Sequence, residues 1–252
     1  MNFDGLQSTY WDQQAQRVER LRQKISEGAV PATPGRVVPD STDLVIGAGR
    51  RLPLTVLFTD ICGFSGRASL TAEQQEMNLR VLNLYFTEMI RIVEDYGGTV
   101  EKNTGDGLMA YFEEMPEYGD ENNSTKRAVA CALTMFAANE YLLSPILRAS
   151  NVTPIEFRAS IEHGMLTIAR LGTPRGFNAN VAIGNAANFA SKMLGKVKAN
   201  QLCLGSAARD RLPPLWQSHW TALADVSTGW SFAGTANPYP LYLYTGRWQK
   251  LV

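Results

Sequence analysis

Two aspartates stand where the sequence could place a metal site. Asp60 follows an apolar run at 54–59, and Asp106 lies in a polar turn between two short β-like runs. A carboxylate at the end of a buried strand is costly unless it meets a cation or hydrogen-bond donors. Two carboxylates, completed by carbonyl and phosphate oxygens, commonly hold Mg²⁺ in phosphoryl-transfer sites. The pattern indicates a metal site. The alternative is that Asp106 only serves its turn and that Asp60 only caps the loop after its strand.

The elements that must position these aspartates are a strand, a helix and a hairpin. The run 54–59 predicts a buried strand. Residues 71–74 carry a capping-box signal, and the apolar positions after them recur at helical spacing. The glycines at 97–98 end that helix, and 99–112 predicts a hairpin with Asp106 in its turn.

The second half of the chain repeats this alternation of helices and strands. It predicts helices at about 124–143 and 185–198, and strands at about 156–162, 201–204 and 239–244. A loop that contains glycine is expected to lead into the second of these helices. Strand–helix–strand–strand followed by helix–strand–helix–strand predicts an α/β sandwich whose sheet is mostly antiparallel.

The N-terminal part of the chain differs from the rest. Residues 8–27 show loosely helical apolar spacing, and the Pro- and Gly-rich stretch 28–39 cannot continue a helix. We therefore expect a helical extension and linker over residues 1–45, followed by one large domain over residues 46–252.

Composition argues against several classes of function. The 252 residues hold 24 Lys plus Arg and 24 Asp plus Glu, so a broad nucleic-acid surface is not expected. The three cysteines lack ligand spacing, and the two histidines lie in unrelated contexts, which predicts reduced thiols and structural imidazoles. The apolar run 128–138 is too short to span a bilayer, and the N-terminus lacks the apolar region of a signal peptide. We expect a cytoplasmic protein.

Three segments, in order, resemble the motifs of the class III nucleotidyl cyclases, the family of adenylate and guanylate cyclases. Residues 58–65 resemble that family's first metal motif, and residues 97–107 resemble its second metal hairpin. Residues 183–192 are similar to the helix that contacts the ribose. The resemblance covers about residues 51–205. It implies a ferredoxin-like cyclase fold for the domain at 46–252, with a mostly antiparallel sheet flanked by helices.

The resemblance implies a reaction and a metal site. In this family the 3′-hydroxyl of a nucleoside triphosphate attacks its own α-phosphorus and expels pyrophosphate, with two Mg²⁺ or Mn²⁺ ions. By the resemblance, Asp60 and Asp106 bind both ions, and the carbonyl of Ile61 adds a ligand.

The resemblance also implies how the triphosphate is held. Arg158 matches an arginine that binds it, a role that suits a forked guanidinium. A glycine-containing loop after the first strand is expected to cradle the β- and γ-phosphates with its backbone N–H groups. These N–H groups belong to Cys62, Gly63, Phe64 and Ser65.

Two positions in the third motif are expected to act on the transition state. Asn188 matches the asparagine that orients the ribose. Four residues later the family has an arginine that stabilises charge at the α-phosphate, and here the residue is Lys192. Lysine keeps the charge but loses the planar fork, so a lower rate is expected. The alternative for both residues is an ordinary polar helix face.

The positions that read the base depart from the family pattern. Lys102 matches the lysine of adenine-specific members, but its partner position is Val181, which can neither donate to nor accept from a base. Glu101 neighbours Lys102 and is expected to face the other way, because side chains alternate along a strand. A late phosphate-binding lysine of the family also has no counterpart, since no lysine lies between Lys198 and Lys250.

These departures leave three interpretations of the substrate. The leading hypothesis is a stand-alone pyrimidine cyclase of bacterial anti-phage signalling, acting on UTP or, second, CTP. It is favoured by a single cyclase domain without transmembrane, sensor or second catalytic segments. The alternatives are an adenylate cyclase that reads its base through Lys102, and a non-catalytic nucleotide-binding pseudo-cyclase. A diguanylate cyclase is not expected, because its Gly-Gly-Asp/Glu-Glu-Phe hairpin is absent.

The resemblance further implies a homodimer. In the family, one subunit supplies the metal aspartates and its partner supplies the base-reading, ribose-binding and α-phosphate residues. One chain that holds both sets implies a head-to-tail, two-fold dimer with two shared active sites. A separate cyclic-nucleotide effector is expected to read the product.

Overall fold

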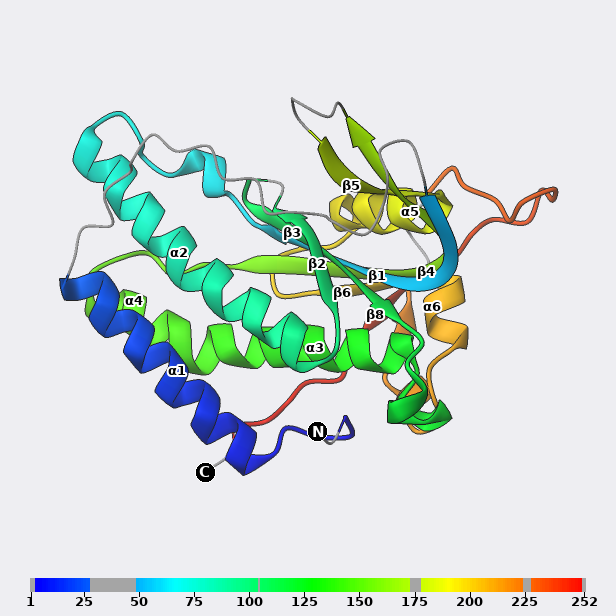
Figure 1. Cartoon of the computed structure of the whole chain (residues 1–252), viewed down its shortest axis with the longest axis horizontal. Coiled ribbons are helices and arrows are strands. Elements are labelled where there is room, and N and C mark those ends of the chain that lie inside the picture. The colour runs from blue at the N-terminus through cyan, green and yellow to red at the C-terminus, as the bar shows by residue number, and fades with distance from the viewer. Residues whose placement is uncertain (1–2, 28–48, 104, 173–177, 224–227, 251–252) are drawn as a thin grey trace.

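The structure is a computed structural model that describes residues 3–27, 49–103, 105–172, 178–223 and 228–250. The linker predicted at 28–39 lies outside these residues. Figure 1 shows the arrangement of the elements. The helices are α1 (Ser8–Glu27), α2 (Ala72–Asp95), α3 (Ser124–Ala138), α4 (Ser144–Ala149), α5 (Asn185–Met193) and α6 (Ser206–Asp210). The strands are β1 (Gly49–Ile61), β2 (Thr99–Asn103), β3 (Gly107–Glu113), β4 (Phe157–Gly172), β5 (Asn178–Ile183), β6 (Leu202–Gly205), β7 (Trp220–Ala222) and β8 (Leu241–Tyr244).

The strands form one 8-stranded sheet in the order β2-β3-β1-β4-β6-β8-β7, with β5 paired to β4. The β4–β6 pair is parallel, and the other pairs are antiparallel. This confirms the predicted α/β fold with a mostly antiparallel central sheet flanked by helices.

Strand β1 separates two hydrophobic cores. Leu57 and Ile61 pack in the core that contains α2 and α3, whereas Val56 and Phe58 pack in the core that contains α5. Alternate residues of a strand face opposite sides of the sheet. Asp60 therefore ends β1 on the face that carries α5.

Helix α2 forms where the sequence predicts it. The Thr71 hydroxyl accepts from the backbone N–H of Gln74, and the Gln74 side chain accepts from the backbone N–H of Thr71, which completes the predicted capping box. The helix ends before Gly97, whose φ of +68° favours glycine. The buried side of α2 consists of Val81, Leu84, Tyr85, Phe86, Glu88, Met89, Ile92 and Val93.

The structure differs from the sequence prediction in two stretches. The strand expected at 156–162 extends to Gly172, and the strand β5 lies where a loop was expected. The single helix expected over 124–143 is interrupted by a π-helical turn at Asn139–Leu143. Pro145 lies in the first turn of α4 and has no N–H to donate to the carbonyl four residues back, so the regular α-helical hydrogen-bond pattern is broken at this point.

One helical stretch, Ser124–Ala149, is long and apolar enough to cross a membrane by length and composition alone. Of its most apolar window, 72% is buried inside the structure. Every residue of α3 is buried, which confirms the expectation of a core helix at 128–138. This burial is what a central helix of a globular domain requires.

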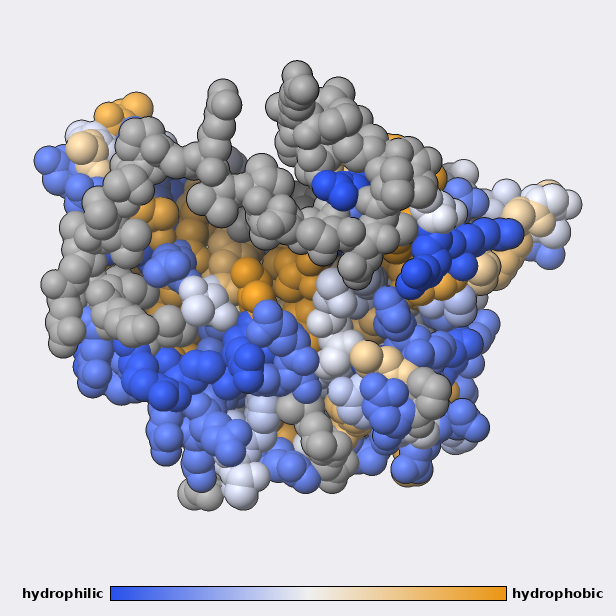
Figure 2. All heavy atoms as spheres, in the orientation of Figure 1, coloured by the Kyte–Doolittle hydropathy of each residue, from blue (hydrophilic) through white to orange (hydrophobic). Residues whose placement is uncertain are grey.

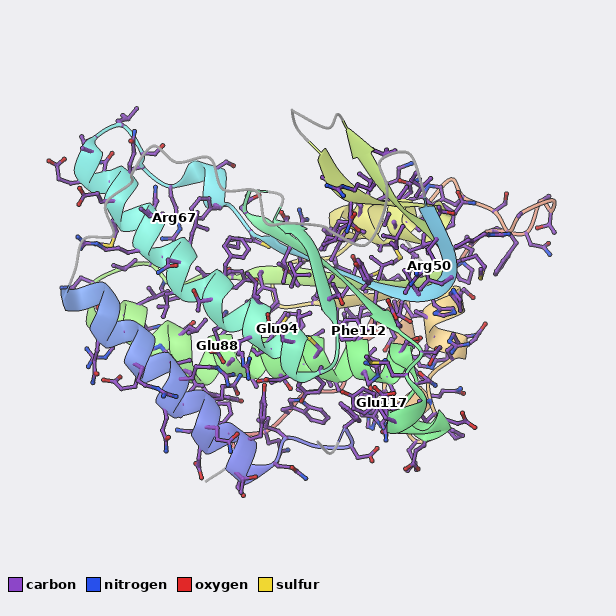
Figure 3. All side chains as sticks on the ribbon, viewed as in Figure 1. Arg50, Arg67, Glu88, Glu94, Phe112 and Glu117 are labelled. Carbon is purple, nitrogen blue, oxygen red and sulfur yellow. The ribbon has the colours of Figure 1, made fainter. Side chains whose placement is uncertain are left out.

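Helix α1 packs on α2 through charged as well as apolar groups. The Arg17 guanidinium donates to the fully buried Glu88 carboxylate through Nε and Nη2, each at 3.1 Å, and Nη1 lies 3.5 Å from Asp95. Figure 3 shows Glu88 on the side of α2 that faces α1. Hydrophilic side chains cover the outer surface of α1 (Figure 2).

Candidate active site

Of the two predicted metal aspartates, Asp60 lies on β1 and Asp106 lies in the turn directly before the neighbouring strand β3. Asp60 of β1 is paired in register with Gly107 of β3, the residue that follows Asp106. The backbone N–H of Ile61 donates to the carbonyl of Asp106 at 3.0 Å. The backbone of the two aspartates is therefore fixed by the sheet itself rather than by a mobile loop.

Arg158 reaches the same point from the other neighbouring strand. It is paired in register with Asp60, and its Nε and Nη2 donate to Asp60 Oδ2 at 3.0 and 2.8 Å. The side chains of Arg158 and Asp60 are 30% and 26% exposed. The sequence assigned Arg158 to the triphosphate, but in this structure its guanidinium neutralises Asp60 instead. A triphosphate that takes up Arg158 would release this carboxylate oxygen.

The oxygen set fits a divalent cation. Within the described part of the chain there is no group of three or more His, Cys, Asp and Glu side chains that could hold a metal. The carboxylates of Asp60 and Asp106 and the carbonyl of Ile61 would therefore act with phosphate oxygens and water. Hard oxygen donors of this kind, with ligands left to the substrate, suit Mg²⁺ or Mn²⁺.

The loop after β1 has the tight shape expected of a phosphate cradle. Gly63 has φ +67°, and the N–H groups of Gly66 and Arg67 close the turn on the carbonyls of Gly63 and Phe64. The backbone N–H of Cys62 donates to the carbonyl of Glu156 at 2.8 Å, so in this structure it is not available to a phosphate. Burial raises the pKa of the Cys62 thiol, so it is not an activated nucleophile.

Arg67 is a cation beside this loop that the sequence analysis missed. Its Nη2 donates to the carbonyls of Thr153 and Pro154, and its guanidinium lies 5.8 Å from the centre of the Phe64 ring. Figure 3 labels Arg67 close to α2. The contacts tie the loop to the segment before β4. The only sequence signal was its position just after the glycine turn.

Helix α5 presents Asn188 and Lys192 to solvent. Ala186, Ala187, Ala190 and Met193 are buried on its inner side. Phe189 stacks on Trp230 with ring centres 4.8 Å apart. Asn188 and Lys192 are both exposed. Among the described residues, no recorded side-chain contact joins either of them to Asp60 or Asp106.

The two expected base-reading positions lie on β2 and β5. Lys102 pairs with Met109, and the half-buried Val181 pairs with Ala169. The Lys102 side chain lies outside the described atoms. The assumption that Glu101 simply alternates with Lys102 is wrong, because a β-bulge interrupts β2 between Val100 and Lys102.

The histidines have structural surroundings. His163 Nδ1 lies 2.9 Å from the Thr55 hydroxyl, and burial lowers its pKa to about 4. Its imidazole is therefore neutral at physiological pH. The His219 ring lies 6.4 Å from the Tyr244 ring centre. Among the described residues, neither histidine has a recorded contact with Asp60 or Asp106.

Comparison with known proteins agrees with the geometry. The family model for the adenylate and guanylate cyclase catalytic domain matches residues 48–226. A uridylate cyclase of Burkholderia cepacia is 28% identical over 161 residues, which is 62% of this chain and 66% of that protein. A uridylate cyclase of Xanthomonas perforans is 27% identical over 67% of this chain and 71% of that protein. An adenylate cyclase of Anabaena cylindrica is 25% identical over 62% of this chain but 30% of its own length.

Solved structures show the same fold. The adenylyl cyclase CyaB from P. aeruginosa superimposes with a TM-score of 0.64 at 25% identity, over 81% of this chain and 100% of that chain. The guanylyl cyclase Cya2 also gives a TM-score of 0.64, at 21% identity, over 79% of this chain and 94% of that chain.

Proposed function

The chain belongs to the adenylate and guanylate cyclase catalytic-domain family and is a nucleotide cyclase, and on that premise we propose that it makes a cyclic pyrimidine nucleotide. The proposed substrate is UTP, with CTP second. The 3′-hydroxyl oxygen forms a bond to the α-phosphorus, the bond from that phosphorus to the bridging oxygen of the β-phosphate breaks, and pyrophosphate leaves. We place the catalytic domain at residues 46–252 and an extension at 1–45.

The observation that carries the proposal is the proximity of the two metal aspartates along the backbone. Asp60 pairs with Gly107, the residue after Asp106, and the backbone N–H of Ile61 donates to the carbonyl of Asp106. Two bound Mg²⁺ or Mn²⁺ ions would lower the pKa of the attacking hydroxyl and neutralise the triphosphate. The aspartates would hold those ions, and the Arg158 guanidinium lies 2.8 Å from Asp60 Oδ2.

The remaining residues would bind and orient the substrate. The N–H groups of Gly63, Phe64 and Ser65 would contact the terminal phosphates, and Arg158 would move from Asp60 to the triphosphate. Asn188 would orient the ribose, and Lys192 would place a positive charge at the α-phosphate as charge develops there. Each of these roles follows the motif match and the position of the residue in the loop after β1, on β4 or on α5.

A pyrimidine substrate is supported by the base-reading position and by the relatives. Val181 offers no hydrogen bond to a purine edge, and it lies on a strand beside a backbone amide that is already engaged. The relatives from B. cepacia and X. perforans are named uridylate cyclases. The relative from A. cylindrica is named an adenylate cyclase, so cAMP synthesis is the second candidate. A pseudo-cyclase is the third.

A shared active site in a head-to-tail homodimer is supported by the exposure of the second residue set. Asn188 and Lys192 face solvent on α5. The β4–β5 hairpin also exposes apolar side chains, with Met165 48% and Ile183 50% exposed. A second copy that covered these residues would bring its own aspartates toward α5.

We further propose that the product is a second messenger in bacterial anti-phage defence, read by a separate effector in the cytoplasm. This part rests on the motif resemblance and on the names of the relatives.

The proposed function is tested by incubating the full chain with an equimolar mixture of UTP, CTP, ATP and GTP and Mn²⁺, and identifying the product by mass. Cyclic UMP or CMP is the expected product, whereas cyclic AMP favours the second candidate. Asp106→Asn should remove all product. The absence of product from every triphosphate contradicts cyclase activity.

A further inference from the structure

Strand β2 contains a bulge at the position next to Lys102. Val100 is opposite Ala110, and Lys102 is opposite Met109, so two steps along β2 match one step along β3. Glu101 is the extra residue. A bulge increases local twist and re-aims a side chain, and bulges are common beside active sites.

The re-aimed Glu101 side chain reaches a strand that is not its neighbour in the sheet. Its Oε1 accepts a hydrogen bond from the backbone N–H of Ala182 in β5 at 3.1 Å. In the described part of the chain β5 pairs only with β4, so the N–H groups on its outer edge need other partners. A carboxylate is a strong acceptor for such an N–H.

The surroundings of a tyrosine on β3 agree with this position of the Glu101 carboxylate. Tyr111 lies on β3, opposite Thr99 of β2. Its pKa is raised by burial and, second, by the negative charge of Glu101. The Glu101 carboxylate is therefore turned toward the face where β2, β3 and β5 approach one another.

This contact lies between the two positions that are expected to read the base. Glu101 is adjacent to Lys102, and Ala182 is adjacent to Val181. One hydrogen bond therefore fixes the backbone at both positions at once. We propose that Glu101 is a positioning residue for base selectivity: it holds β2 and β5 at one separation, which admits a single-ring pyrimidine and disfavours a two-ring purine. This inference rests on the proposed function.

The proposal explains how a site with Val181 can still discriminate. Valine cannot hydrogen-bond a base edge, so selectivity must come from shape and from groups held at fixed distances. A fixed gap discriminates only while its two walls cannot move apart. Without the Glu101 contact, β5 keeps its ladder with β4 but loses this hydrogen bond to β2.

The test compares four full-length proteins: the natural chain, Glu101→Ala, Glu101→Gln and the control Glu113→Ala. Glu113 is an exposed glutamate on the same hairpin, at the end of β3. For each protein, kcat and KM are measured with UTP, CTP and ATP in Mn²⁺. Hydrogen exchange of the peptide that contains residues 178–183 is followed in parallel, because it reports the β5 contact without any substrate.

Glu101→Ala is expected to lower the pyrimidine-to-purine ratio of kcat/KM by about tenfold, mainly through KM. Exchange in β5 should become faster. Glu101→Gln retains an oxygen that can accept from Ala182 and should keep the ratio within about threefold of the natural chain. Glu113→Ala should change neither. If Glu101→Ala does not fold, Glu101→Asp replaces it, since its side chain is one methylene shorter.

An unchanged ratio in a folded Glu101→Ala or Glu101→Asp protein overturns the inference while leaving the cyclase activity in place. Unchanged exchange in β5 overturns the contact itself. No product from the natural chain with any triphosphate is a failure of the proposed function, and the selectivity claim falls with it.

Discussion

At the scale of single residues, the site differs from the sequence prediction in the partners of two charged side chains. Asp60 was expected to face a metal ion and Arg158 a triphosphate, yet the two side chains bind each other. Both are partly exposed, so the pair adds little to stability. Its consequence is local: the guanidinium balances the charge of the aspartate.

Lys192 gives a prediction at this scale. Lys192→Arg should raise kcat by up to about tenfold, because a planar guanidinium can contact two oxygens of the α-phosphate where an ammonium contacts one. The measurement is steady-state product formation with Mn²⁺. Lys198→Arg, on an exposed residue beyond the helix, is the matched control. A Lys192→Arg protein slower than the natural chain would contradict the role given to this position.

Glu162 gives a prediction that concerns pH. This buried residue of β4 accepts hydrogen bonds from the N–H groups of His163 and Ala208 and from the Tyr239 hydroxyl. Burial outweighs these donors and raises its pKa from 4.5 to about 6. The folded protein thus binds this proton more tightly than the unfolded chain, so the stability it contributes is present below pH 4.5 and is lost as the pH rises through 6.

Glu162→Gln should remove this dependence. The stability of the natural chain relative to Glu162→Gln should fall by roughly 2 kcal/mol between pH 4.5 and pH 7, measured by urea unfolding at each pH. The difference between the two proteins matters because His163 has a lowered pKa and changes stability in the opposite direction over part of this range. A difference that is constant with pH would show that Glu162 ionises as an exposed glutamate does.

At the scale of elements, most of the elements that position the site could be predicted from the sequence. These are α2 with its capping box and its glycine stop, the strand that leads to Asp60, and the hairpin around Asp106. Each of them depends on local residue types. The bulge at Glu101 could not be predicted from the sequence. It is defined by a register shift against β3 and by a contact with β5, and the sequence predicts a loop where β5 lies.

The long β4–β5 hairpin was missed for a related reason. Strand β4 continues past the motif around 158–164. It is stabilised by pairing with β1 and with β5. The π-helical turn before α4 was also missed, although Pro145 gave a signal for it. Local patterns fix the start of an element more reliably than they fix its end, because pairing partners decide how far it extends.

Helix α1 gives a prediction at the scale of elements. Arg17→Ala should destabilise the protein by about 3 kcal/mol, because it leaves the fully buried Glu88 carboxylate without its partner. Urea unfolding measures the change. The double variant Arg17→Met with Glu88→Leu should recover most of the loss, since it removes both charges. A single variant within about 0.5 kcal/mol of the natural chain would show that α1 is not held by this pair.

At the scale of the whole molecule, the two residue sets of the expected active site lie on different elements. Asp60 lies near the end of β1 beside Arg158 and Asp106 lies just before β3, whereas Asn188 and Lys192 are exposed on α5. Among the residues that the structure describes, no side-chain contact joins the two sets. A two-fold partner would complete two sites at once.

Mixing two inactive proteins tests this account most directly. Asp60→Ala removes a proposed metal ligand and Asn188→Ala removes the proposed ribose contact, so each alone should make almost no cyclic nucleotide. In a random mixture half of the dimers are mixed, and each mixed dimer has one intact site of two. Activity should therefore return to about one quarter of the natural level if sites are shared across a two-fold dimer. A mixture that stays as inactive as its components, in proteins shown to exchange subunits, would contradict the shared site.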